Sequence, residues 1–273
     1  FFKPRTTTME KTFHKVILAD GTEVSITLDG HKKNDRYGTN LELTGFGNWY
    51  GSINMSNMIA DHFSTLFQVG FQSQSGFKLL ELGTGLGRAG IIAAKIMELH
   101  ATEYSKSFFL LTDGEDDVVN LTQKNCLTNL LSSDLGVQYQ CKKLCWGENI
   151  GLIEIQRDYP QGFDCIIGCD LIYGPNQVES FTSLLYTVNN LLIRKDNEAE
   201  NSDEKQEENE DLLIISDYDT KLSSNFYLAV TRRELLPMED LQEIAKKFDL
   251  SMKMLEDYTF DIFETNCDVE SML

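Results

Sequence analysis

The sequence predicts an α/β fold built on a doubly wound, mostly parallel sheet, and three observations support this. From about residue 77, short apolar runs alternate with segments of helical periodicity. The apolar runs, such as Phe108–Leu111 and Cys165–Gly168, do not alternate with polar residues, which is typical of parallel strands covered on both faces. The chain of 273 residues, 41% of them hydrophobic, is long and apolar enough for one large domain.

The first segment is predicted to be a β-hairpin. Residues 13–28 hold two β-rich runs joined by Asp20-Gly21, a common hairpin turn. After a polar stretch, Ser52 is a candidate N-cap for a helix that reaches about Phe67. We therefore divide the chain into an N-terminal extension, residues 1–45, and a main domain, residues 46–273. The chain begins with Phe1, and we assign no function to the residues before Met9.

The main domain is expected to contain seven strands. The periodicity predicts, in order, strand 77–82, helix 87–99, strand 107–112, helix 115–131, strand 137–144, a loop, strand 163–169, helix 176–193, an acidic segment and strand 212–217. An amphipathic helical region follows over about 226–248, interrupted near Pro237. Strands at about 250–256 and 259–264 predict a closing antiparallel hairpin.

The charge of the chain excludes some partners. Its 24 basic and 43 acidic residues give a net charge of −19, which disfavours nucleic acids and anionic membranes and favours a basic protein partner. Residues 195–211 contain nine acids and two lysines. This acidic segment is too polar to fold alone and is predicted to be a mobile surface loop, either an inert linker or a docking site for a basic partner.

The cysteines and the apolar runs suggest an intracellular protein. The six cysteines lack the spacing of a disulfide framework and are predicted to be reduced, and no metal site is expected because the two close cysteine pairs belong to different strands. No apolar run approaches the ~20 residues of a membrane span, and the N-terminus lacks a signal-peptide core. We expect a cytoplasmic location, with the nucleus in addition, and a monomer.

The most informative stretch is the glycine turn of residues 83–87, which follows a strand and opens a helix. Gly83 and Gly85 can take positive φ, so backbone N–H groups and a helix N-terminus come close to a ligand. The spacing Gly85-x-Gly87-x-x-Gly90 fits a dinucleotide, whereas Glu81 with the same glycines fits S-adenosylmethionine. Glu81 favours the latter, because a carboxylate repels a pyrophosphate and attracts a cationic amino acid. A glycine turn without a ligand is the alternative.

Further polar residues end the following strands, where ligands bind in such sheets. Asp113, followed by Gly114, is suited to accept hydrogen bonds from ribose hydroxyls, or alternatively caps the next helix. Trp146 either stacks on adenine or packs in the core. Tyr218 is a weaker candidate for the lip of the site.

Several motifs occur in an order that resembles class I, seven-strand S-adenosylmethionine-dependent methyltransferases. They are Glu81–Gly87, Thr112–Gly114, Leu144–Gly147 and Cys169–Tyr173. The likeness is greatest to the non-SET protein-lysine methyltransferases, in which the fourth strand ends in Asp-x-x-Tyr, here Asp170–Tyr173, and a tryptophan precedes the first helix, here Trp49. It covers residues from about 45 to 265. The departures are Tyr50 after Trp49, Cys169 where alanine is common, and the acidic segment.

The resemblance implies a Rossmann-like methyltransferase domain that binds S-adenosylmethionine and methylates a protein side-chain nitrogen, most simply that of lysine. Asp170 and Tyr173 would face the methyl acceptor as catalytic residues. The implied cofactor contacts are Trp49, Glu81, Gly83, Thr84, Gly85, Gly87, Asp113, Gly114, Trp146 and Cys169.

Methyl transfer needs a neutral amine, which burial favours; Asp170 would orient the amine, and Tyr173 would hydrogen-bond to it or pack beside it. The alternatives are that Asp170 caps a helix and Tyr173 is a packed aromatic. A small-molecule methyltransferase, an NAD-dependent oxidoreductase and a non-catalytic binding module on the same fold stay open as functions. The oxidoreductase lacks its expected Tyr-x-x-x-Lys pair, because Gln177 follows Tyr173 at that spacing. The non-catalytic module predicts lost glycines or a lost Asp113, and these are present.

Overall fold

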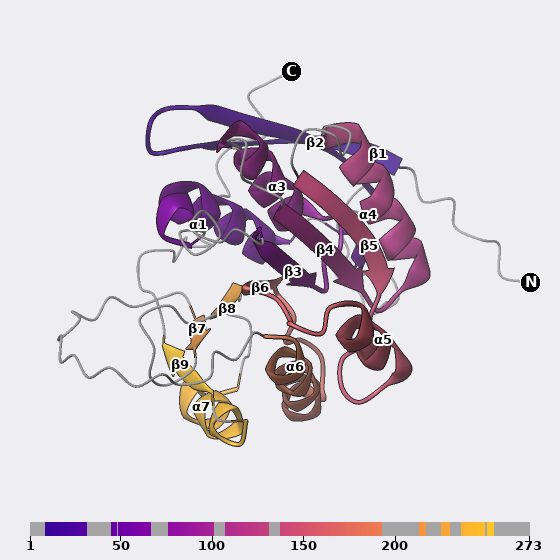
Figure 1. Ribbon diagram of the computed structural model, residues 1–273, viewed down its shortest axis with the longest axis vertical. Coiled ribbons are helices and arrows are strands. Elements are labelled where there is room, and N and C mark those ends of the chain that lie inside the picture. Colours follow the sequence, from indigo (N-terminus) through magenta and orange to yellow (C-terminus); the bar gives the residue numbers. More distant parts are fainter. Residues whose placement is uncertain are drawn as a thin grey trace, which may run out of the picture.

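The computed structural model describes residues 9–31, 45–47, 49–66, 76–100, 107–130, 137–192, 213–216, 225–229, 236–248 and 250–253. A central seven-stranded sheet carries helices on both faces, and a separate two-stranded hairpin packs on the outside of one helical layer (Figure 1). The predicted α/β fold is confirmed. The acidic segment 195–211, Tyr218, Cys267 and the predicted strand 259–264 lie outside the described residues.

The strands of the large sheet follow the order β5-β4-β3-β6-β8-β7-β9. Their bounds are β3 Lys78–Leu82, β4 Ser107–Asp113, β5 Val137–Lys143, β6 Cys165–Cys169, β7 Leu213–Ser216, β8 Asn225–Ala229 and β9 Ser251–Lys253. The first five in this order are parallel, whereas β7 is antiparallel to both β8 and β9. The chain reverses its direction across the sheet between β5 and β6, which places a switch point beside β3.

Alternate strand residues enter two separate cores, one on each face of the sheet. Leu79, Phe109 and Ile167 belong to the core beneath α1, α3 and α4, whereas Leu80, Leu110 and Ile166 belong to the core beneath α5, α6 and α7. Both faces of β3, β4 and β6 are therefore buried, which explains their continuous apolar runs. The helix bounds are α1 Tyr50–Leu66, α3 Arg88–His100, α4 Asp116–Asn129, α5 Ile150–Asp158, α6 Gln177–Leu191 and α7 Met238–Lys246.

The N-terminal hairpin is confirmed. β1 (Met9–Ile17) and β2 (Glu23–His31) pair in antiparallel register. Asp20 shapes the turn by accepting a 2.8 Å hydrogen bond from the Thr22 amide, and Gly21 has a φ of 85°. Buried residues of the hairpin, including Val24, Ile26 and Leu28, join the core shared with α1 and α3, so the hairpin is packed into the fold.

The structure corrects the sequence prediction in the last third of the chain. Residues 226–229, expected to be helical, belong to β8, and the helix begins only after Pro237. Phe226 and Leu228 enter one core while Tyr227 and Ala229 enter the other, so this buried strand is apolar throughout and its pattern does not separate strand from helix. In the sheet β8 lies between β6 and β7, and β7 corresponds to the predicted strand 212–217. β9, at the place of the predicted strand 250–256, pairs with β7, and the second strand of the predicted hairpin lies outside the described residues.

A second correction concerns the predicted loop between the third and fourth strands. It contains helix α5, whose N-cap Asn149 accepts a 3.1 Å hydrogen bond from the Leu152 amide. In the part of the chain described, no helix has the length and hydropathy needed to span a membrane. Over the same ranges, no group of three or more His, Cys, Asp or Glu side chains is arranged to hold a metal ion.

Candidate cofactor and acceptor site

The predicted site residues of three strands converge at one edge of the sheet. Leu82 pairs with Thr112 of β4 and with Gly168 of β6, so Gly83, Asp113 and Cys169 follow at the same level. This edge holds the carboxyl ends of the parallel strands, where ligands bind in doubly wound sheets. The structure therefore brings together residues that lie far apart in the chain.

The glycine turn has the backbone conformation that its sequence predicts. Gly83, Gly85 and Gly87 have φ values of 58°, 53° and 81°. A Cβ atom on Gly83 would lie 2.5 Å from Leu171 Cδ2 and 3.3 Å from Trp146 Cζ2. Gly83 and Gly85 are partly exposed, whereas Gly87 is buried against Thr122. Gly83 and Gly85 therefore form the accessible surface of the turn, and Gly87 serves its packing.

The backbone amides of the turn are used differently from the prediction. The N–H groups of Thr84 and Gly87 donate 2.8 Å hydrogen bonds to the carbonyls of Thr112 and Thr84, respectively. The Gly85 N–H donates to Asp113 Oδ2 at 3.1 Å. These three donors stabilise the turn itself, so its glycines contribute chiefly by leaving space.

Glu81 is buried beneath the turn and fastens it to α3. Its Oε2 accepts hydrogen bonds from Thr84 Oγ1 at 2.6 Å and from the Gly90 N–H at 3.2 Å. Burial, together with the nearby Asp113 carboxylate, raises the pKa of Glu81 to about 7, although the two hydrogen bonds act to lower it. A Cβ atom on Gly90 would lie 2.5 Å from Glu81 Oε2, so a glycine is needed there.

Asp113 lies between the turn and the start of α4. Besides Gly85, it accepts a 3.3 Å hydrogen bond from the Glu115 amide through Oδ1. Burial raises the pKa of Asp113, although hydrogen bonds from the backbone oppose this shift. The side chain remains partly exposed at the site edge, beside Gly114. It therefore orders the protein locally and still offers carboxylate oxygens to a ligand.

Of the two tryptophans, Trp146 lies against the turn and Trp49 lies before α1. Trp146 is half-buried. Its Cζ2 atom would lie 3.3 Å from a Cβ atom on Gly83, and its side chain packs against the core beneath α5 and α6. Trp49 precedes α1, and its carbonyl accepts hydrogen bonds from the Ser52 N–H at 3.2 Å and the Ser52 Oγ at 2.7 Å. Ser52 therefore lies inside the helix. The sequence prediction that Ser52 is the N-cap was wrong.

The residue that caps α1 is Asp170. Its Oδ2 accepts a 2.8 Å hydrogen bond from the Gly51 N–H. Asp170 has a φ of 52°, the one positive value for a non-glycine residue in the described ranges, and its own amide donates to the Ala229 carbonyl. A Cβ atom on Gly51 would lie 2.7 Å from the carboxyl group. Asp170 is thus held tightly between β8 and the start of α1.

The remaining residues of the Asp-x-x-Tyr segment differ in exposure. Leu171 and Ile172 are buried in the core, whereas Tyr173 is 48% exposed. Cys169 lies near Glu81, and burial raises the pKa of its thiol well above the usual value. Tyr173 is therefore free to meet a large acceptor, while Cys169 is an apolar wall of the site.

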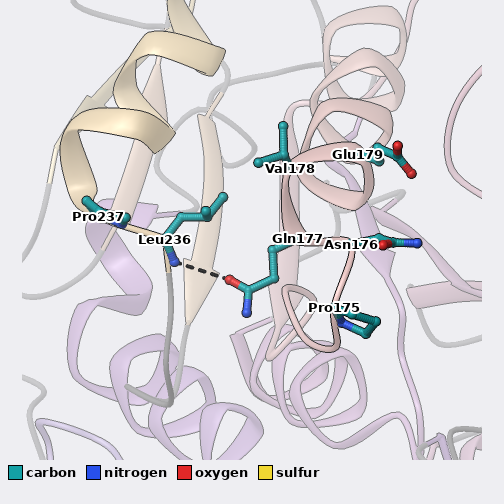
Figure 2. A pocket seen from close by; sticks show the side chains of 7 residues that line it. All are labelled: Pro175, Asn176, Gln177, Val178, Glu179, Leu236 and Pro237. Atoms are coloured by element: carbon teal, nitrogen blue, oxygen red, sulfur yellow. Dashed lines mark hydrogen bonds between the residues drawn. The ribbon is translucent and has the colours of Figure 1, made fainter.

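A hollow of about 430 Å³ lies next to this segment, between the start of α6 and the residues that precede α7 (Figure 2). Gln177 reaches across it and accepts a 3.1 Å hydrogen bond from the Leu236 amide. Its lining residues are Pro175, Asn176, Gln177, Val178, Glu179, Leu236 and Pro237. The glycine turn is not part of this hollow.

Sequence reasoning missed the residues of α4 that support the turn. Thr122 Oγ1 donates a 2.6 Å hydrogen bond to the Gly85 carbonyl, and Asn125 Nδ2 donates a 3.0 Å bond to the Leu86 carbonyl. Both side chains are fully buried. The available signal was their polarity at helical spacing among the apolar residues Val118, Leu121 and Cys126, because buried polar groups need partners.

Comparison with known proteins decides the family. The sequence profile described as lysine methyltransferase matches residues 45–219. The chain belongs to this lysine methyltransferase family. The resemblance in the motifs is thereby confirmed.

Over 125 residues the chain is 33% identical to "Protein N-lysine methyltransferase METTL21A" of Danio rerio. This match covers 45% of the chain and 48% of the Danio protein, so the chain spans about half the length of this curated relative.

Solved structures of methyltransferases are more distant from this family member. The S-adenosylmethionine-dependent methyltransferase from Agrobacterium tumefaciens aligns with 82% of the chain and 55% of its own length, with a TM-score of 0.41 and 13% identity. SMU.776, solved in complex with SAH, aligns with 82% of the chain and 44% of its own length, with a TM-score of 0.43 and 13% identity.

Proposed function

We propose that this protein is an S-adenosylmethionine-dependent methyltransferase that modifies a lysine side-chain nitrogen of a protein substrate. The observation that carries this proposal is the convergence of the glycine turn, Asp113 and the Asp170–Tyr173 segment at one edge of the sheet, in a member of the lysine methyltransferase family. A cofactor side and an acceptor side then lie next to each other.

The residues present fit this cofactor. Gly83 and Gly85 have positive φ in the partly exposed part of the turn, and half-buried Trp146 next to Gly83 offers an aromatic face suited to adenine. Asp113 offers carboxylate oxygens for ribose hydroxyls. Glu81 shapes the turn from below, and a cationic ammonium group nearby would stabilise its ionised form. When bound, S-adenosylmethionine supplies an electrophilic methyl group on its sulfonium.

On the acceptor side, the protein must hold a neutral amine in line with that methyl group. Because Asp170 is fixed by the Gly51 amide and the Ala229 carbonyl, its carboxyl group is in a defined position to accept a hydrogen bond from the amine and orient the lone pair. Exposed Tyr173 can pack along the alkyl stem of the lysine. Positioning of this kind supplies up to ~7–11 kcal/mol of the barrier reduction in well-oriented systems.

The charge of the chain supports a basic protein substrate. A net charge of −19 attracts lysine-rich surfaces and repels nucleic acids and anionic membranes. We further propose that the protein acts as a monomer, in the cytoplasm and also in the nucleus. These proposals rest on the sequence alone.

The first test is calorimetric titration of the purified protein with S-adenosylmethionine and, separately, with NAD. We expect saturable binding of S-adenosylmethionine, lost in Asp113→Ala. Asp116→Ala is the matched control, because it removes an exposed carboxylate three residues later that only pairs with Lys143. Binding of NAD alone would contradict the proposal. An equal loss of S-adenosylmethionine affinity in Asp113→Ala and Asp116→Ala would also contradict it.

The second test separates the roles of Asp170. Asparagine keeps an oxygen for the Gly51 amide and tolerates positive φ, whereas alanine removes the cap. If the carboxylate orients the amine, Asp170→Asn keeps the melting temperature and cofactor affinity but lowers kcat in a labelled-methyl assay on the acceptor found in a lysate screen. If Asp170→Asn has the same kcat as wild type, the role of Asp170 is limited to capping α1.

A further inference from the structure

The free edge of the N-terminal hairpin is covered by two asparagines of α4. The Thr27 N–H donates to Asn129 Oδ1 at 2.8 Å, and Asn129 Nδ2 donates to the Thr27 carbonyl at 2.8 Å. Asn125 repeats this pattern with Asp29, at 2.8 Å and 3.1 Å. The two side-chain amides lie one helical turn apart and take the place of a neighbouring strand along β2.

Asn125 differs from Asn129 in one further bond. Its Nδ2 also donates to the Leu86 carbonyl of the glycine turn at 3.0 Å, whereas the other bond of Asn129 Nδ2 goes to the Asn125 carbonyl within α4 at 2.7 Å. Asn125 is 1% exposed, and both of its amide hydrogens and its oxygen are engaged. A single buried amide therefore joins the hairpin to the turn.

Other contacts between the hairpin and the turn lie close by. A Cβ atom on Gly30 of β2 would lie 3.0 Å from Leu86 Cδ1, so the backbone of the hairpin approaches this side chain closely. Arg88, the first residue of α3, places Nη2 2.8 Å from the ring nitrogens of His14 in β1. The segment from Leu86 to Arg88 therefore has three contacts on this side: Asn125 bonds the Leu86 carbonyl, Gly30 approaches the Leu86 side chain, and His14 lies against Arg88.

We propose that Asn125 is a positioning residue for cofactor binding, which couples the N-terminal hairpin to the glycine turn. This inference rests on the proposed function. Because the hairpin and a bound cofactor both favour the same arrangement of the turn, each stabilises the other, and the coupling is reciprocal. The hairpin then contributes to cofactor affinity without contacting the cofactor.

The pair of asparagines provides the test. In titrations with S-adenosylhomocysteine, Asn125→Ala is expected to raise Kd about tenfold, the effect of losing one buried hydrogen bond. Asn129→Ala removes comparable bonds to β2 but none to the turn, so its Kd should stay within about twofold of wild type. Both variants should melt at lower temperature. Equal Kd values for the two variants would overturn the inference.

Hydrogen exchange of the wild-type protein keeps the inference testable even if Asn125→Ala does not fold. S-adenosylhomocysteine should slow exchange of the Thr27 and Asp29 amides, although neither belongs to the turn. Ligand binding without this protection would overturn the coupling alone. Failure of the wild-type protein to bind either S-adenosylmethionine or S-adenosylhomocysteine would overturn the proposed function and this inference together.

Discussion

Glu81 occupies a position where a carboxylic acid is enclosed by the fold and still has polar partners. It accepts hydrogen bonds from Thr84 and Gly90 with one oxygen, so it links the glycine turn to α3. The sequence suggested a direct contact with the cofactor. That contact stays a prediction, and the structure shows in addition that Glu81 supports the turn from within and that burial raises its pKa.

Glu81 should make the stability of the protein fall as pH rises. Its folded pKa is about 7, above the ordinary 4.5, so between these values the folded state keeps a proton that the unfolded state has lost. Stability is then full below about pH 4.5 and decreases up to about pH 7. In denaturant titrations this falling contribution should be present in wild type and absent from Glu81→Gln, so the stability of Glu81→Gln should rise more steeply with pH than that of wild type between about pH 4.5 and 7. An unchanged slope in Glu81→Gln would contradict the assignment.

Gly83 should be the least replaceable glycine of the turn. Gly21 and Gly83 both have positive φ, but a Cβ atom on Gly21 meets nothing within 4 Å, whereas one on Gly83 collides with Leu171. Gly21→Ala should therefore lower the free energy of unfolding only by the backbone strain, about 1–2 kcal/mol. Gly83→Ala should cost more and also abolish cofactor binding. Denaturant unfolding measures the loss of stability, and calorimetric titration measures cofactor binding. Equal stability and equal cofactor affinity of Gly21→Ala and Gly83→Ala would refute this prediction.

At the scale of elements, the hairpin is part of the main structure rather than an appended arm. Its inner residues share a core with α1 and α3, and its edge is bonded to α4. The sequence predicted the hairpin from its turn but treated it as an extension. Docking of the hairpin depends on Asn125 and Asn129 of α4, and the sequence pattern does not show that their partners lie in β2.

His14 should make hairpin docking sensitive to acid. Its pKa is lowered from 6.5 to about 4, first by burial and then by the charge of Arg88. As pH falls from about 6.5 to 4, the unfolded state binds a proton that the folded state excludes, so stability decreases. His14→Gln should lose this dependence in denaturant titrations from pH 4 to 7. A wild-type acid slope in His14→Gln would assign the effect to other groups.

The effects of His14 and Glu81 oppose each other. Between about pH 4.5 and 6.5 the first makes stability rise with pH and the second makes it fall. Wild type should therefore show partial cancellation, which the two single variants separate. The double variant should be flatter than either, because the groups lie on different elements.

At the scale of the whole molecule, the net charge of −19 sets how partners approach. The field disfavours polyanions and accelerates encounters with basic proteins, an effect that salt screens within about 10 Å at 0.1 M. The charge therefore supports the proposal of a basic partner, whereas the residues at the strand ends carry the proposed chemistry.

Salt should therefore weaken catalysis on a protein substrate through KM rather than kcat. For a lysine-rich acceptor identified by labelled-methyl transfer, we expect KM to rise several-fold between about 0.05 and 0.5 M NaCl, with kcat nearly constant. A short peptide with a single lysine should show a much smaller rise. A salt-independent KM for the protein acceptor would exclude electrostatic steering.

The sequence by itself determined the glycine turn, the polar strand ends and the hairpin turn, because each depends on local sterics and on short-range periodicity. The tertiary structure decided the rest. Asp170 caps α1 by bonding the Gly51 amide 119 positions earlier, and Asn125 bonds Asp29 of β2, 96 positions away. β8 replaced a predicted helix because a strand buried on both faces shows no alternation. Long-range hydrogen bonds form only when packing brings their partners together, so a local sequence pattern does not identify the partners.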